Sequence, residues 1–210
     1  MAGTIDIRAL EQIDTIVHLA GASIAEKRWT DARKKEILES RIKSTGLLYQ
    51  SLKNNHHTIK TFVSASTINY YDFGEDDKIF VENDTPGTDF LAQVTQQWEN
   101  EVDKLRNLGL RVVKIRIGIV LSEKGGALKK MAMPIKFGLG ASLGTGKQFL
   151  SWIHIDDLCE MFVTAIEEEK MSGAYNATTG WCTNSSMNCI ASTIAFKSSG
   201  CSNMQESMPT

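Results

Sequence analysis

Side chains suited to hydrogen bonding or proton transfer follow an apolar segment near the middle of the sequence. The segment ends in Ser64-Ala65-Ser66, and Tyr71 follows five residues later. A hydroxyl at a strand end can hydrogen-bond a substrate carbonyl or alcohol. A phenol can act as acid or base where a cation lowers its pKa from about 10. Ser66 and Tyr71 are therefore candidate catalytic residues. The alternative is that Ser66 caps a turn and Tyr71 packs in the interior.

Small residues end an earlier apolar run, where a ligand could approach the backbone. This run closes with His18-Leu-Ala-Gly21, and the missing or short side chains of Ala20 and Gly21 would admit a cofactor. In an open parallel sheet, ligands lie beyond the carboxyl ends of the strands, which is where this segment is expected. The alternative is a strand that merely ends in small residues.

A third segment, residues 138–157, combines glycines, a lysine and aromatic side chains. Lys147 follows the pair Gly144 and Gly146, and Trp152 and His154 come shortly after it. Such a segment suits an anionic, for instance phosphorylated, substrate. It is not a phosphate-binding P-loop, because Gln follows the lysine where that motif needs Ser or Thr.

Alternating strands and helices must position these residues. Apolar runs predict strands at 14–21, 61–65, 111–117, 149–154 and 174–177. Helical spacing predicts a helix capped by Thr30 with a stripe from Leu38 to Leu52, a second over 88–107 ended by Gly109, a third over 127–137, and a fourth that Asp156 caps. The fold class is thus α/β with a mainly parallel sheet, over residues 1–180. Residues 181–210, poor in charge and without periodicity, are expected to form a divergent, poorly ordered tail.

Composition excludes several classes of protein. The 210 residues carry 23 basic and 25 acidic side chains, so the chain has no net positive charge that would favour nucleic acid as a partner. No apolar run of about 18 residues is present, so no membrane span is expected. The start lacks the features of a secretion signal, and the four cysteines have no metal-binding spacing, so we expect free thiols, a cytoplasmic location and no metal site.

These segments, in this order, resemble the extended short-chain dehydrogenase/reductase family, and within it the sugar-nucleotide epimerase-like branch, often labelled NAD-dependent epimerase/dehydratase. The resemblance runs from about Asp14 to Asn184. It is carried by His18-Leu-Ala-Gly21, Arg28-Trp29, Ser40-Arg41, Ser64-Ala-Ser66 with Tyr70-Tyr71, Asp89-Phe90-Leu91, Trp98-Glu99, Arg116-Ile-Gly118-Ile-Val-Leu121 and Trp152-Ile-His-Ile-Asp-Asp157.

The resemblance implies a Rossmann-type, doubly wound sheet that binds NAD or NADP, with NADP slightly favoured, and that transfers hydride at a carbonyl or alcohol carbon of a nucleotide-sugar-like or other small-molecule substrate. By similarity, Ser66 would hydrogen-bond the substrate. The implied cofactor-binding residues are Ala20, Gly21, Ser64, Ala65, Arg116, Gly118 and Ile119, and Lys147, Trp152 and His154 would face the substrate.

The sequence departs from the family pattern in two places. Leu91 and Thr95 stand where the family has its catalytic Tyr and Lys, so Tyr71 is a substitute candidate. No Gly-rich βαβ unit precedes Asp14, so the sheet is expected to be incomplete at the N-terminus, with an open edge that favours a homodimer or pairing with another chain. Two alternatives stay open: a catalytically silent nucleotide-binding protein, and a truncated, non-functional fragment.

Overall fold

The structure is a computed structural model that describes residues 4–72, 79–129, 149–178 and 180–183. The chain divides into two compact units. Residues 1–117 and 157–177 form the first, and residues 118–156 and 178–210 form the second. Each unit is described by itself.

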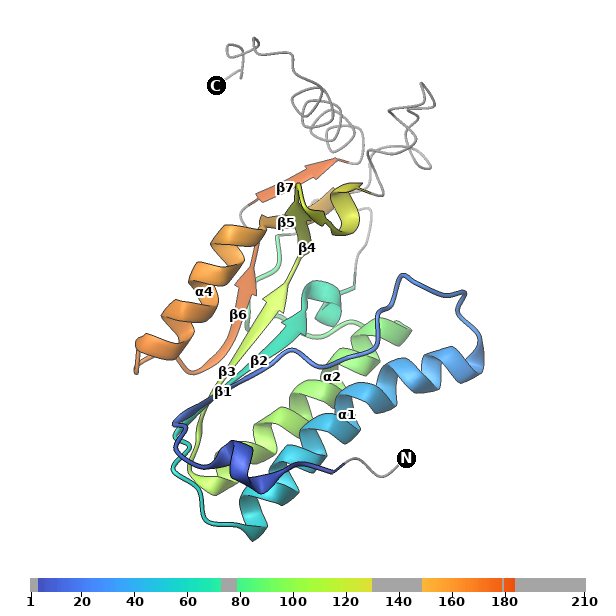
Figure 1. Cartoon of the computed structure of the whole chain (residues 1–210). Coiled ribbons are helices and arrows are strands. Elements are labelled where there is room, and N and C mark those ends of the chain that lie inside the picture. Colours follow the sequence, from blue (N-terminus) through green and yellow to red (C-terminus); the bar gives the residue numbers. More distant parts are fainter. Residues whose placement is uncertain (1–3, 73–78, 130–148, 179, 184–210) are drawn as a thin grey trace. The chain divides into compact units, whose positions relative to one another are not determined.

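The first unit contains a four-stranded parallel sheet (Figure 1). Its strands are β1 (Thr15–His18), β2 (Thr61–Thr67), β3 (Arg111–Ile117) and β6 (Gly173–Ala177), in the order β1-β2-β3-β6. Parallel pairing aligns Ile16, Phe62 and Val112 across three strands. Because all four strands run in one direction, their carboxyl ends meet at one edge, which is where the predicted site residues were expected. The predicted α/β, Rossmann-like class is confirmed.

Two helices cover one face of this sheet and lie beside each other in Figure 1. Helix α1 (Asp31–Asn54) begins where predicted, and the Thr30 hydroxyl accepts a hydrogen bond from the Arg33 N–H. Helix α2 (Phe90–Asp103) starts two residues later than expected, because the Asp89 side chain caps it by accepting from the Ala92 N–H. A 3₁₀ turn, η3 (Lys104–Leu108), continues it to Gly109, whose φ of 80° ends the helix.

The main hydrophobic core lies between the sheet and these two helices. Phe62 and Val112 project from the strands against Leu52 of α1 and Trp98 of α2, and the turn η1 (Ile7–Leu10) adds Leu10. The apolar stripe of α1 is displaced from the prediction: the fully buried residue in the first half of the helix is Ile37, whereas Leu38 is only partly buried.

Strand β1 is at one end of the sheet order and pairs only with β2 among the described strands. On and just after it, Val17 and Leu19 are 41% and 64% exposed. The open edge is therefore a feature of the described sheet, and its pairing with a second chain stays a prediction. None of the described helices is long and apolar enough to cross a bilayer.

Helix α4 (Ile155–Glu167) lies on the other side of the four strands in Figure 1, and Arg111 holds its carboxyl end. The Arg111 guanidinium donates to the carbonyl oxygens of Ala165 and Ile166 at 2.8 Å and of Met171 at 3.0 Å. A cation that pairs with terminal carbonyls satisfies acceptors that a helix end leaves without partners.

We expect Arg111→Met to lower the free energy of unfolding by about 1–3 kcal/mol, because several carbonyl acceptors lose a charged donor together. Urea denaturation measures the loss. Lys170→Met removes an exposed cation close to the same helix end and should change stability by less than about 0.5 kcal/mol. Equal effects of the two substitutions would contradict the capping role of Arg111.

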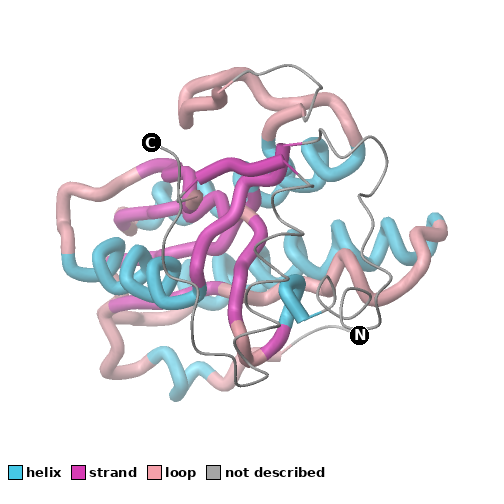
Figure 2. Tube along the Cα trace, turned by 90° about the horizontal axis from the view of Figure 1, so that it is seen from above, coloured by secondary structure: helices cyan, strands magenta, loops and turns pink. Residues whose placement is uncertain are grey.

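The second unit contains a three-stranded sheet, which Figure 2 shows in magenta with the other strands. It is formed by β4 (Ile119–Ser122), β5 (Phe149–His154) and β7 (Gly180–Thr183), in the order β4-β5-β7. Strand β5 confirms the prediction for 149–154. Strand β7 reaches three residues into the expected tail, and residues 184–210 lie outside the described part of the chain, as does most of the helix predicted over 127–137.

The prediction that Asp156 caps the last helix is wrong. Helix α4 already begins at Ile155, so Asp156 lies within its first turn. The imidazole Nδ1 of His154 accepts the Asp156 N–H at 3.3 Å. His154 thus takes the capping position, and the Asp156 carboxylate instead lies in the first turn, where the helix dipole favours a negative charge.

Gly118 lies where the second unit leaves no room for a side chain. A Cβ at this position would lie 2.8 Å from the Ser151 carbonyl oxygen and 3.1 Å from the Thr178 methyl carbon. We expect Gly118→Ala to lower the midpoint of thermal unfolding, with a cost of about 1–3 kcal/mol, because a backbone carbonyl must move. Gly125→Ala is the control, since a Cβ there meets nothing within 4 Å. A Gly118→Ala variant as stable as the wild type would contradict this, because it would show that the β5 backbone moves at little cost.

Candidate functional site

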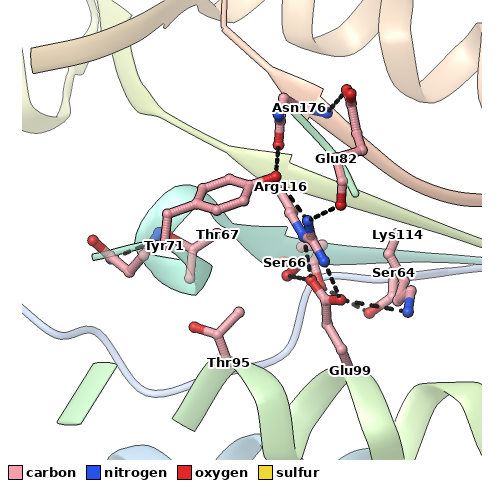
Figure 3. A network of polar contacts seen from close by, with 12 residues as sticks. Ser64, Ser66, Thr67, Tyr71, Glu82, Thr95, Glu99, Lys114, Arg116 and Asn176 are labelled. Atoms are coloured by element: carbon pink, nitrogen blue, oxygen red, sulfur yellow. Dashed lines mark hydrogen bonds and ion pairs between the residues drawn. The ribbon is translucent and has the colours of Figure 1, made fainter. Parts of the chain in front are cut away.

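The carboxyl half of the first unit's sheet contains a buried ion pair between Arg116 of β3 and Glu99 of α2 (Figure 3). The guanidinium Nε lies 2.8 Å from Oε1 of Glu99, and Nη2 lies 2.9 Å from Oε2, so the two groups meet in a bidentate pair. Arg116 is 3% exposed and Glu99 is 4% exposed. In this geometry the pair orders the side chains around it.

Two further side chains of the sheet bind the Glu99 carboxylate. The Ser66 hydroxyl donates to Oε1 at 2.6 Å, and Nζ of Lys114 lies 3.4 Å from Oε2 and 2.7 Å from Asp103. Burial raises the pKa of the Glu99 carboxyl, but the hydrogen bonds from Arg116 and Ser66 and the Lys114 charge outweigh burial, so this pKa lies below its usual range. Burial likewise lowers the pKa of Arg116, and Glu99 more than compensates, so the pKa is raised. Both groups stay ionised.

Tyr71 is tied to the same pair. Nη1 of Arg116 donates to the Tyr71 hydroxyl at 2.8 Å, and the hydroxyl lies 3.0 Å from Oδ1 of Asn176 and 3.1 Å from the Val81 carbonyl. The cation that a catalytic phenol requires is therefore present. However, Tyr71 is 2% exposed, and burial raises its pKa despite its hydrogen bonds with Asn176 and Arg116. The phenol is held as a neutral hydrogen-bonding group.

The same residues fasten residues 80–82 to the strand ends. The ring of Phe80 stacks on Tyr71 with centroids 4.9 Å apart. The Glu82 carbonyl accepts from Arg116 at 3.0 Å, and the Glu82 carboxylate accepts the Asn176 N–H at 2.9 Å. The network thus connects β2, β3, β6 and this loop at the carboxyl edge of the sheet.

A small polar cavity of about 180 Å³ opens beside the ion pair. On one side, Cζ of Arg116 lies 3.5 Å from the centre of the Tyr70 ring. The cavity wall carries two acidic and two basic side chains, so its formal charge balances. Its lining residues are Tyr70, Gln96, Glu99, Asn100, Asp103, Lys114 and Arg116.

The end of β1 presents exposed backbone beside a buried histidine. Ala20 and Gly21 are exposed, and their contact with a cofactor stays a prediction. His18 and its register partner Ser64 are buried, and the Ser64 hydroxyl donates to the Ala65 carbonyl at 2.8 Å. Accessible contact at this strand end therefore comes from residues 19–21, of which Leu19 is 64% exposed.

His18 is held neutral. Its Nε2 lies 3.2 Å from the Ser44 hydroxyl, which itself donates to a carbonyl, and Nδ1 is buried without a partner among the described residues. Nε2 is accordingly the protonated nitrogen of the neutral ring, and burial lowers the pKa of His18 from 6.5.

A pH-dependent loss of stability follows from His18. Below pH 6.5 the unfolded chain binds a proton that the folded chain excludes, so the free energy of unfolding falls as pH is lowered from 6.5 toward the folded pKa. We expect His18→Gln, which cannot titrate, to flatten this part of the profile. Urea denaturation at several pH values measures it, with His56→Gln as an exposed control. An unchanged slope in His18→Gln would contradict the assignment.

The remaining predicted site residues lie in the second unit. Gly118 precedes β4, and Ile119 pairs with Trp152 of β5 in parallel register. His154 ends β5 and is about half exposed. This sheet thus brings together Gly118, Ile119, Trp152 and His154. Lys147 lies outside the described residues.

Sequence reasoning did not identify Lys114 or Asn176, and it used Glu99 only as part of a motif. The sequence did contain a signal for them. Every second residue of the two strands lies on the face that also buries Phe62, and these positions hold polar or charged residues: Ser64 and Ser66 on β2, and Lys114 and Arg116 on β3. Charged residues on a buried strand face need partners of opposite charge, and α2 offers Glu99 and Asp103 at helical spacing.

Comparison with known proteins decides the family. The sequence model of the NAD dependent epimerase/dehydratase family matches residues 4–178. The chain belongs to this family. It is 38% identical over 177 residues to an epimerase family protein of Mycobacterium bovis and 41% identical over 172 residues to one of Staphylococcus saprophyticus. These matches cover 84% and 80% of this chain but only 58% and 56% of those relatives, so the chain spans little more than half their length.

Solved structures agree with this assignment. A human epimerase family protein with NADPH superposes with a TM-score of 0.79 at 28% identity, over 89% of this chain and 64% of that one. A nucleoside-diphosphate sugar epimerase of Corynebacterium glutamicum gives 0.78 at 31% identity, over 92% and 41%. A UDP-glucuronic acid 4-epimerase of Bacillus cereus, at 19% identity and a TM-score of 0.75, shares the fold.

Helix α2 contains Leu91 and Thr95, where the wider short-chain dehydrogenase/reductase resemblance places a Tyr and a Lys. At the positions expected for Tyr and Lys, Thr95 is buried and its hydroxyl donates to the Leu91 carbonyl at 2.7 Å. Ser66 directs its proton to Glu99. Among the described residues of α2, none carries a phenol or an ammonium group.

Proposed function

We propose that this chain belongs to an NAD(P)-dependent oxidoreductase or epimerase that acts on a nucleotide-sugar-like or other carbonyl or alcohol substrate in the cytoplasm. The observation that carries the proposal is the common carboxyl edge of four parallel strands, with exposed backbone at Ala20 and Gly21, in a chain of the NAD dependent epimerase/dehydratase family. NADP is slightly favoured over NAD by the family resemblance; the human epimerase family protein was determined with NADPH, and the Bacillus cereus UDP-glucuronic acid 4-epimerase with NAD.

The exposed residues at the end of β1 support a dinucleotide site there. Gly21 and Ala20 would let the dinucleotide approach the backbone, and Gly118 and Ile119 would lie beside its nicotinamide by family resemblance. When bound, the nicotinamide supplies hydride transfer. The network of Arg116, Glu99, Ser66 and Tyr71 acts as a positioning device in this proposal: it fixes the strand ends and residues 80–82 without itself exchanging protons.

A second candidate is a nucleotide-binding protein without turnover. It is favoured by the Ser66 proton donated to Glu99 and by the raised pKa of Tyr71. In the first proposal, the substrate contacts Trp152, His154 and Lys147. The group that acts as acid or base then belongs to the segment that faces the substrate.

NADPH fluorescence titration of the full 210-residue chain tests the proposal. We expect saturable binding, and the first proposal also predicts NADPH oxidation or epimerisation with a nucleotide sugar. Binding without turnover would favour the second candidate. Absence of any dinucleotide binding by a chain that melts cooperatively would overturn both, and absence of a cooperative transition would favour the truncated fragment.

A further inference from the structure

Arg41 is a half-buried cation in the middle of α1. Its side chain contacts the segment that follows β1. Its Nη1 donates to the carbonyl oxygens of Ala22 at 3.1 Å and Ile37 at 2.9 Å. The guanidinium lies over the Trp98 ring, with Cζ 5.2 Å from its centre. Two carbonyls and an indole therefore hold the group in one orientation.

Among the residues that the structure describes, Arg41 has no acidic partner. The buried Arg33 and Arg116 each bind a carboxylate, from Glu36 and Glu99 respectively. Burial lowers the pKa of Arg41, and the charge of Arg33 lowers it further, which is the behaviour of a positive group without compensation. The end of β1 therefore has a positive potential that a bound anion would neutralise.

The edge of Arg41 that suits an anion is open. Because Nη1 is already used, Nε and Nη2 remain, and this pair forms the fork that binds phosphate or carboxylate with two parallel hydrogen bonds. Neither atom has an acceptor among the described residues. Neither is enclosed, in contrast to Nε of Arg33, which is buried without a partner.

Gly21 leaves room for the Arg41 guanidinium beside this segment. A Cβ at position 21 would lie 3.2 Å from Cζ and 3.4 Å from Nε of Arg41. A side chain at position 21 would therefore press on the guanidinium, which glycine avoids. The Ala22 N–H is already fixed by the Ser40 hydroxyl at 2.9 Å, so the segment is held in place without a ligand.

We propose that Arg41, left open by Gly21, binds a phosphate group of a nucleotide ligand at the carboxyl end of β1. This inference rests on the proposed nucleotide-binding function and adds the residue and the chemical group that are recognised. A phosphate carries more charge than a carboxylate, so the uncompensated charge of Arg41 favours it. The phosphate belongs either to the dinucleotide cofactor or to a nucleotide-activated substrate.

Binding measurements with four probes test the inference: NADPH, NADH, UDP and inorganic pyrophosphate, each titrated calorimetrically into the full chain. We expect Arg41→Gln to weaken at least one of them about 10- to 100-fold, the effect of losing a charge-assisted pair of hydrogen bonds. Loss for NADPH alone would identify a 2′-phosphate, loss for both dinucleotides their pyrophosphate, and loss for UDP without the dinucleotides the substrate diphosphate.

Two more variants separate recognition from structure. Gly21→Ala keeps every charge but crowds the fork, and should weaken the same probe. Lys43→Gln removes an exposed cation of α1 paired with Glu39, and should change affinity less than about 2-fold. The affinity of the Arg41→Gln variant for the probe should depend less steeply on salt concentration than the affinity of the wild type does.

Unchanged affinities in an Arg41→Gln chain that melts as the wild type does would overturn the inference. So would a wild-type chain that binds none of the four probes. If the wild type binds pyrophosphate or UDP through Arg41 but no dinucleotide, the anion site stands and the proposed dinucleotide function fails.

Discussion

Glu99→Ala should destabilise the chain by about 3–5 kcal/mol in urea denaturation, because it leaves the Arg116 guanidinium buried without its carboxylate. Lys114 and Ser66 lose a partner in the same step. The folded pKa of Glu99 is lowered, so its contribution is present above the unfolded value of about 4.5 and is lost as pH falls through the folded pKa. The difference between wild type and variant should therefore shrink in acid.

Two control substitutions distinguish the loss of a buried partner from the loss of any charge. Glu39→Ala removes an exposed carboxylate that pairs with Lys43 on α1, and should cost less than about 1 kcal/mol. The double variant Glu99→Met with Arg116→Met replaces both charges by apolar groups and should recover much of the loss. If Glu99→Ala costs no more than Glu39→Ala, the carboxylate does not organise the network.

The strands and helices of the first unit followed from local pattern. Thr30 and Gly109 mark a helix start and a helix end by their own chemistry, a side-chain acceptor in one case and a φ of 80° in the other. The apolar runs at 61–65 and 111–117 became central strands because both faces are covered. Such features depend on a few neighbouring residues, so the sequence is sufficient to predict them.

The chemistry of the site was less predictable, because it depends on pairings across the sequence. Arg116 was expected near the cofactor by resemblance, yet its donors are directed to Glu99, Tyr71 and the Glu82 carbonyl, residues 17, 45 and 34 positions away. Its cofactor-binding role stays a prediction. The cation that the sequence did not reveal beside Tyr71 is this same arginine. Whether burial or the nearby charge determines the pKa of the Tyr71 phenol depends on tertiary packing, which a local sequence pattern does not contain.

Phe62→Ala should lower the free energy of unfolding by about 3–5 kcal/mol, as large as the loss at Glu99 but for a different reason. Phe62 is 0% exposed and packs with Leu52, Trp98 and Val112, which come from α1, α2 and β3. Removing the ring leaves a cavity where three elements meet, and its neighbours on the rigid sheet cannot close it. Because typical domains are stable by only about 5–15 kcal/mol, the variant should be close to unfolding at 37 °C.

A graded series distinguishes this cavity from general sensitivity to substitution. Phe62→Leu keeps most of the volume and should lose less than Phe62→Ala, and Ile79→Ala, at a residue 70% exposed, should be within about 0.5 kcal/mol of the wild type. The Glu99 and Phe62 losses should differ in acid: the Phe62 loss has no titrating group behind it and should persist where the Glu99 loss fades. A Phe62→Ala loss that disappeared at low pH would place the ring in the polar network and not in the apolar core.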